Sequence, residues 1–207
     1  MISTMRIDSL AAQPDRAGRY RAVFSDGSVM RLYKQTVQDF GLYTGLELTE
    51  SEMDSLCAAA AEMSAKMRAV RIVSASSVSK KDLEQRLLLK GEDPACAQKA
   101  VRWMEEMNLL DDRKTAEQIV FRCISKGYGL ARAKQALYEK RIPKALWQEV
   151  LEDYPDQSEA IRDFIVCHLP DQPDQKAVKI VIDALLRKGH SYGAIRRVLD
   201  CGDILED

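Results

Sequence analysis

The sequence has no long apolar run, and this absence excludes a helix that spans a membrane. No stretch of the 207 residues approaches the roughly 18 consecutive apolar residues that a membrane span needs. The first residues, MISTMRIDSLAAQPDR, also lack the basic start and the apolar core of a secretion signal. We therefore expect a cytoplasmic protein that makes no membrane contact.

Residues that carry catalysis or bind metals are also scarce. The two histidines, His168 and His190, stand outside any metal-ligand spacing, and no phosphate-binding glycine loop or nucleophile elbow is present. We expect no catalytic residue, no metal and no cofactor, and hence no enzyme. We place His190 in solvent, because it follows a helix-ending glycine. The five cysteines form no CxxC pair, so we expect reduced, buried apolar side chains at Cys57, Cys96, Cys123, Cys167 and Cys201.

Net charge is nearly absent, at −1, but the charges are segregated along the chain. Residues 113–141 hold eight basic and two acidic residues, a net +6, whereas residues 149–174 hold one basic and eight acidic residues, a net −7. Such segregation can steer association with an anionic partner, although charged helix faces are often merely solvated. The candidate binding residues are Arg113, Lys114, Arg122, Lys126, Tyr128, Arg132, Lys134, Lys140 and Arg141. The alternative for Tyr128 is a core position at a helix junction.

The first part of the chain predicts strands and the remainder predicts helices. The runs 19–24 and 28–33 are strand-like and are separated by an Asp-Gly turn, which predicts a hairpin. A polar connector with two glycines follows. From Thr49 onward the pattern is helical, beginning with a capping box between Thr49 and Glu52. Ser79 predicts a second helix start, Asp93-Pro94 a third, and Pro143 another.

One helix junction recurs three times without gaps. The segments LLLKGEDPACAQKAV, LYEKRIPKALWQEVL and LLRKGHSYGAIRRVL begin at Leu87, Leu137 and Leu185. The lysines three residues later are 50 and 48 positions apart. Near-constant periods of this size are typical of stacked helical units, although any two helix junctions share some of these features.

We therefore predict a mainly α protein of tandem three-helix repeats in a curved, elongated array, preceded by a small N-terminal β-hairpin region. The expected boundaries are residues 1–48 for the hairpin extension, 49–111 for the first repeat, 112–155 for the second and 156–207 for the third. A chain of this kind can act as a monomer.

Several segments, in this order, resemble the RecX family of recombination regulators. They are SKKDLEQRLLLKG, NLLDDRKTAEQIV, SKGYGLARAKQALYEKRI and the C-terminal RKGHSYGAIRRVLD. The hairpin and the following DFGLYTGLELTESEMDSL are similar to the N-terminal extension of that family. The resemblance thus covers nearly the whole chain.

The resemblance implies a regulatory protein that lies in the groove of the filament formed by the recombinase RecA on single-stranded DNA. Such a protein modulates, and mostly inhibits, RecA ATP hydrolysis, strand exchange and co-protease activity in recombination, DNA repair and the SOS response. Some family members bind single- or double-stranded DNA directly. Two alternatives stay open from the residues themselves: a stand-alone DNA-binding helical module, and a helical scaffold for another partner.

Overall fold

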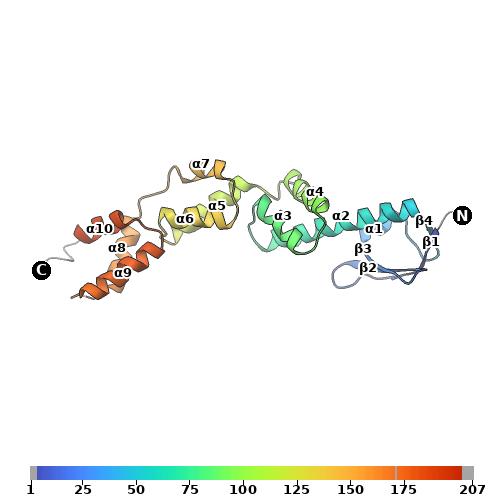
Figure 1. The fold of residues 1–207 in the computed structure, drawn as a ribbon, viewed down its shortest axis with the longest axis horizontal. Helices are drawn as coiled ribbons and strands as arrows, with labels where there is room; N and C mark the ends of the chain where they lie inside the picture. Colours follow the sequence, from blue (N-terminus) through green and yellow to red (C-terminus); the bar gives the residue numbers. More distant parts are fainter. Residues whose placement is uncertain (1–3, 171, 202–207) are drawn as a thin grey trace. The chain divides into compact units, whose positions relative to one another are not determined.

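A computed structural model describes residues 4–170 and 172–201, and these divide into two compact units. The N-terminal unit comprises the described residues up to Ser76 together with Leu83–Leu110. The C-terminal unit comprises Ser77–Asp82 and the described residues from Asp111 onward. Each unit is mainly helical, and the strands of the described residues belong to the N-terminal unit (Figure 1). The predicted mainly α class with a small β region is therefore confirmed.

The N-terminal unit contains a four-stranded antiparallel sheet in the order β3-β2-β1-β4. Its strands are β1 (Thr4–Leu10), β2 (Arg19–Phe24), β3 (Val29–Tyr33) and β4 (Glu47–Thr49). The predicted hairpin is β2 and β3, joined by a turn in which Gly27 has a φ of 80°. Strands β1 and β4 extend the predicted hairpin into a sheet. The segment predicted as a polar connector contains a short helix, α1 (Lys34–Asp39), and that part of the prediction is wrong.

A long helix, α2 (Glu50–Ala75), follows the sheet, and the N-terminal unit also holds α4 (Pro94–Glu106) and most of α3 (Lys80–Leu89). The first residues of α3, up to Asp82, belong to the C-terminal unit. The capping box that begins α2 is present: Glu52 N–H donates to the Thr49 side chain, and the Glu52 carboxylate accepts from Thr49 N–H at 2.8 Å. Leu56 packs from α2 into the core of the sheet, beside Phe24 and Leu48. The start of α4 is also as predicted, since Asp93 caps it and proline follows.

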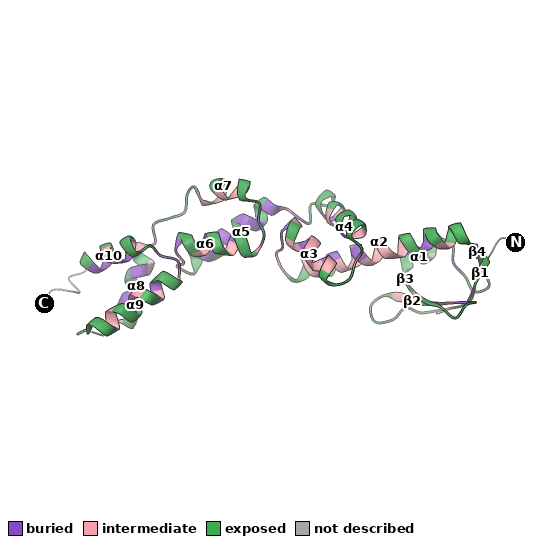
Figure 2. Ribbon diagram, viewed as in Figure 1, coloured by how far each residue is buried: buried purple, intermediate pink, exposed green. Residues whose placement is uncertain are grey.

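The C-terminal unit holds two further groups of helices. The first consists of α5 (Asp112–Ser125), α6 (Leu130–Glu139) and α7 (Trp147–Leu151), which is preceded by one 3-10 turn, Lys144–Leu146. The second consists of α8 (Ser158–His168), α9 (Gln175–Arg187) and α10 (Tyr192–Asp200). Each group has buried positions on all of its longer helices (Figure 2) and its own buried cluster, which includes Leu137 in one group and Leu185 in the other. We call α2–α4, α5–α7 and α8–α10 the first, second and third repeats.

The predicted repeat is visible in the backbone at three equivalent junctions. Leu87, Leu137 and Leu185 are each fully buried near the ends of α3, α6 and α9. Four residues after each leucine the chain adopts a positive φ, of 82° at Gly91, 55° at Arg141 and 89° at Gly189. The next N–H donates back to the leucine carbonyl at 3.1, 3.0 and 3.2 Å, respectively. This is one helix-ending motif used three times. The boundaries at residues 48, 111 and 155 and the curvature of the array stay predictions.

Candidate partner-binding surface

The basic segment predicted from the sequence folds into α5, α6 and the turns that follow them. Arg113, Lys114 and Arg122 lie on the exposed part of α5, and Lys126 is its C-cap. Lys134 is exposed on α6, Arg132 is half-buried there, and Lys140 and Arg141 form the turn after it. The segment therefore forms a basic region on one repeat, distributed over two helices and a turn.

Three of these basic side chains are already neutralised within the molecule. Arg113 contacts Glu117 at 3.1 Å and Glu149 at 2.7 Å, and these carboxylates raise the pKa of its guanidinium, Glu117 most. The Lys114 ammonium lies 3.8 Å from Asp111, and Arg132 lies 3.3 Å from Glu139. Exposed pairs of this kind contribute little to stability, but they reduce the charge that these side chains offer a partner.

The other basic side chains of the segment have no intramolecular ion pair with any carboxylate of the described residues. They are Arg122, Lys126, Lys134, Lys140 and Arg141. Arg122 and Lys126 are four residues apart, so they are neighbours on one side of the helix end. The structure thus reduces the predicted cationic set to a smaller group of unneutralised charges.

Tyr128 belongs to a packed junction and is only partly accessible. It packs against the buried cluster of the second repeat, and its carbonyl accepts a hydrogen bond of 2.6 Å from the Tyr154 hydroxyl. Burial raises the pKa of Tyr154 to about 12, so this hydroxyl stays protonated as a donor at neutral pH. The Lys188 ammonium lies 5.8 Å from the Tyr128 ring centre and 4.7 Å from that of Phe164. This placement corresponds to the alternative of a core position at a helix junction.

Two exposed aromatic side chains were missed by the sequence reasoning. Phe121 on α5 is 69% exposed, and Tyr138 on α6 is 66% exposed. A signal for Phe121 was available, because it stands on the side of the helix opposite the stripe that contains Ile119 and Cys123. Aromatic residues and arginine are enriched in protein interfaces and in their binding hot spots.

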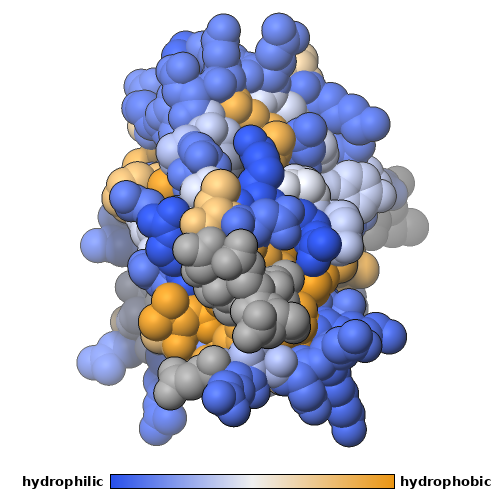
Figure 3. All heavy atoms as spheres, turned by 90° about the vertical axis from the view of Figure 1, so that its left-hand side faces the viewer, coloured by the Kyte–Doolittle hydropathy of each residue, from blue (hydrophilic) through white to orange (hydrophobic). Residues whose placement is uncertain are grey.

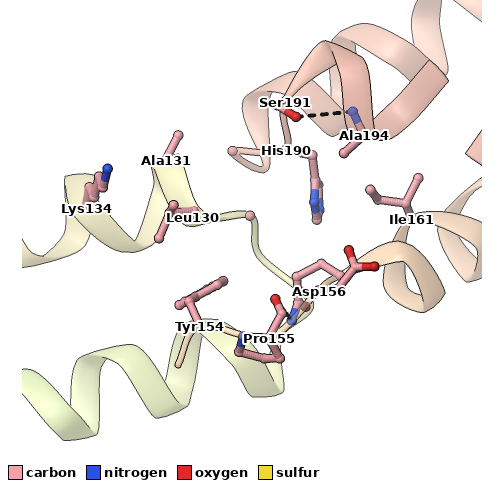
Figure 4. A pocket seen from close by; sticks show the side chains of 13 residues that line it. Leu130, Ala131, Lys134, Tyr154, Pro155, Asp156, Ile161, His190, Ser191 and Ala194 are labelled. Carbon is pink, nitrogen blue, oxygen red and sulfur yellow. Dashed lines mark hydrogen bonds between the residues drawn. The ribbon is translucent and has the colours of Figure 1, made fainter. Parts of the chain in front are cut away.

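A cavity of about 560 Å³ lies within the C-terminal unit, where the second and third repeats meet (Figure 4). Its walls come from the start of α6, residues 154–157, Ile161 of α8 and the start of α10. The imidazole of His190 extends between these elements (Figure 4), and its Nε2 lies 3.0 Å from the Gly127 carbonyl oxygen. Because a carbonyl can only accept, Nε2 carries the proton of this bond.

His190 is buried, with 6% of its surface exposed, so its expected position in solvent is wrong. The reason is that the turn it follows packs against the second repeat. Gly129 N–H donates to the Lys188 carbonyl at 3.0 Å, and Ala131 N–H donates to the Gly189 carbonyl at 3.2 Å. Burial lowers the pKa of His190 more than the bond to Gly127 raises it. A neutral imidazole at a packed joint is a structural element there.

The cysteines differ from their predicted burial. Only Cys123 is buried, Cys96 is half-buried, and the other three are exposed: Cys57, Cys167 and Cys201. Within residues 4–170 and 172–201, no group of three or more His, Cys, Asp or Glu side chains could hold a metal ion. None of the helices described there is long and apolar enough to cross a membrane.

Apolar side chains are also exposed on the third repeat. Among hydrophilic neighbours, they are visible on the face that Figure 3 turns toward the viewer. The exposed large apolar residues of this repeat include Val166, Ile180, Leu186 and Tyr192. Ile180 and Leu186 line a shallow groove with Asp183 and Arg187 on α9. These residues carry no excess of one charge that would indicate a particular partner.

Comparison with known structures supports the fold. A crystal structure of regulatory protein RecX superposes with a TM-score of 0.66, at 20% identity, over 95% of this chain and 99% of the other. The crystal structure of RecX from Lactobacillus salivarius gives a TM-score of 0.59 at 19% identity, over 71% of this chain and 99% of that one. At these identities the likeness establishes the fold alone.

Sequence comparison identifies relatives that share one name, although no family model matches the chain. Regulatory protein RecX of Clostridioides difficile is 24% identical over 201 residues, which cover 94% of this chain and 93% of the relative. Regulatory protein RecX of Chlorobaculum tepidum is 30% identical over 135 residues, 63% of this chain and 83% of the relative. With this identity over most of a relative's length, and with the matching fold, the chain belongs to the RecX family of regulatory proteins.

Proposed function

We propose that this protein binds the filament that RecA forms on single-stranded DNA and modulates, mostly by inhibition, the activities of RecA. These are ATP hydrolysis, strand exchange and co-protease activity, in recombination, DNA repair and the SOS response. The observation that carries the proposal, beside the family, is the set of unneutralised basic side chains on the second repeat. The filament is polyanionic through its DNA, so such a surface favours association and orients the bound protein.

The test is ATP hydrolysis by RecA on single-stranded DNA as a function of added protein. The informative variant reverses three charges that have no intramolecular ion pair: Arg122→Glu, Lys126→Glu and Lys134→Glu. Because these side chains are exposed, the fold should survive, and the inhibition should require at least tenfold more protein. The matched control makes the same charge change in the N-terminal unit, at Arg16, Arg31 and Lys34, which are also exposed.

Three results would contradict the proposal. The first is no effect of the wild-type protein on hydrolysis at molar excess across salt concentrations. The second is full inhibition by the reversed variant with native circular dichroism, which would remove the basic surface from the mechanism. The third is equal weakening by the control variant, which would assign the effect to net charge alone.

A stand-alone DNA-binding module is the second candidate function, and the same unneutralised bases favour it. Phosphate contacts release counterions, so this function requires binding to DNA without RecA that weakens steeply with salt. Measuring fluorescence anisotropy of labelled single- and double-stranded DNA from about 50 to 200 mM salt separates the two functions.

We further propose that the protein acts as a cytoplasmic monomer, with repeat boundaries near residues 49, 112 and 156. Sedimentation velocity and limited proteolysis test the monomer and the boundaries.

A further inference from the structure

Helix α5 has two opposite faces with different chemistry. Its buried face carries Asp112, Ala116, Ile119 and Cys123, which follow one another at helical spacing. The opposite face carries Lys114, Gln118, Phe121 and Ser125, all exposed and at the same spacing. The two rows are offset by two residues, or about 200° around the helix. Phe121 therefore points directly away from the core of its repeat.

The exposure of Phe121 has no explanation inside the second repeat. The buried cluster of this repeat is formed without it, from residues of α5, α6 and the following turn. With 69% of its surface exposed, the ring leaves apolar area in water that a partner could cover. Isolated apolar residues on a surface are common. This one, however, is followed directly in the sequence by Arg122, whose charge has no intramolecular partner among the described carboxylates.

The surroundings of Phe121 favour a protein partner over nucleic acid. Binding sites for single strands place several aromatic rings so that successive bases stack, whereas Phe121 is the sole aromatic residue of α5. The carboxylates of Glu117 and Glu149 also lie in this area, around Arg113. They would repel a phosphate backbone, whereas a protein surface with mixed charges can accommodate them.

We propose that the exposed face of α5 is a protein-docking surface, with Phe121 as its central anchor and Arg122 as the charged residue of its rim. Its partner surface is an apolar pocket bordered by carboxylates. The proposal rests on the proposed function, within which this pocket belongs to the RecA subunits of the filament. Aromatic anchors at the centre of an interface account for most of its binding free energy, while the rim contributes specificity and association rate.

The experiment compares Phe121→Ala, Phe121→Leu and wild type in two binding assays. Co-sedimentation with RecA filaments on single-stranded DNA measures docking to the filament, and fluorescence anisotropy with the same DNA alone measures nucleic-acid binding. The control is Tyr43→Ala, since Tyr43 is a similarly exposed aromatic residue, at 59%, in the N-terminal unit. Alanine is a good helix former and Phe121 lies outside the core, so native helicity is expected for both α5 variants.

For Phe121→Ala, we expect filament binding to weaken at least roughly tenfold, as for a central anchor, with unchanged affinity for DNA alone. Phe121→Leu should weaken filament binding less, because it retains apolar contact, and Tyr43→Ala should bind as wild type does. Wild-type filament binding by Phe121→Ala would overturn the anchor and leave the proposed function standing. An equal loss of affinity for DNA alone would overturn the choice of a protein partner. Failure of the wild-type protein to bind filaments better than DNA would overturn both proposals together.

Discussion

The joint between the second and third repeats gives the most quantitative prediction, through Gly129. A Cβ atom at this position would lie 2.0 Å from the Gly189 carbonyl oxygen and 2.4 Å from the His190 nitrogen, where ordinary contact begins at 3.4 Å. Both neighbours are backbone atoms, which cannot rotate away as the end of a side chain can. Replacing Gly129 by alanine therefore forces the two backbone segments apart by more than 1 Å.

The expected cost follows from what this separation removes. The hydrogen bonds from Gly129 N–H to Lys188 and from Ala131 N–H to Gly189 would be lost, at about 0.5–1.5 kcal/mol each. Overpacking adds about 1–3 kcal/mol. Gly129→Ala should thus lower the free energy of unfolding of the C-terminal unit by about 2–6 kcal/mol, reduced slightly by the lower entropy of the unfolded alanine chain.

Urea unfolding followed by tryptophan fluorescence can measure this cost. The chain has two tryptophans, of which Trp103 lies in the N-terminal unit and Trp147 in the C-terminal unit. On a Trp103→Phe background, the emission reports on the C-terminal unit alone.

The matched control is Gly193→Ala in α10, where an added Cβ meets nothing within 4 Å. It should be neutral or stabilising by up to about 1 kcal/mol. The free energy of unfolding of Gly129→Ala could also lie within about 0.5 kcal/mol of the wild-type value, as for an ordinary surface substitution. That result would show that the backbone contact is not as tight as described.

Three further predictions concern buried groups. Burial lowers the pKa of His190, so the unfolded chain binds a proton near pH 6.5 while the folded chain resists it. The free energy of unfolding of the C-terminal unit should therefore fall between pH 7.5 and 5.5, and His190→Gln should flatten that slope in urea titrations. Ser79→Ala removes a 2.6 Å hydrogen bond to the Lys140 carbonyl and the cap of α3. In urea unfolding, it should lower the free energy of unfolding of the C-terminal unit by about 2–3 kcal/mol. A loss below about 0.5 kcal/mol would mean that the hydroxyl is dispensable. Burial raises the pKa of the Cys123 thiol, so this thiol should react with a maleimide much more slowly than the exposed Cys57, Cys167 and Cys201. Mass spectrometry measures the labelling of each cysteine over time. Equal labelling rates would contradict the burial of Cys123.

Features that depend on neighbouring residues were predictable from the sequence. The β2–β3 hairpin turns over the short segment Ser25-Asp26-Gly27, with Gly27 at a positive φ, and the starts of α2 and α4 have capping side chains within three residues. The repeat was also accessible, because Leu87, Leu137 and Leu185 occupy the same place in the same local motif. In each case, the residues that determine the geometry lie close together in the chain.

Features that depend on distant residues were not predictable. Strand β1 pairs with β4 more than 35 residues away, and its own segment contains charged residues that hide the pattern. The sequence predicts an available positive charge at Arg113, but Glu149, brought close by the fold, neutralises it. His190 follows a glycine as many solvent-exposed residues do, and only the packing of its turn against the second repeat buries it.

The repeat places equivalent residues at two joints in the C-terminal unit, and the two joints use different chemistry. Ser79, the residue that precedes α3, donates a hydrogen bond from its hydroxyl to the backbone carbonyl of Lys140, in the turn after α6. Gly129, the equivalent residue before α6, instead donates a hydrogen bond from its backbone N–H to the backbone carbonyl of Lys188, in the turn after α9. The first contact is made by a side chain, so a substitution there loses the hydrogen bonds of one hydroxyl and leaves the backbone segments free to approach each other. Backbone atoms set the second, so any side chain at Gly129 separates the segments. The second joint should therefore tolerate substitution less than the first, although neither position belongs to the proposed binding surface.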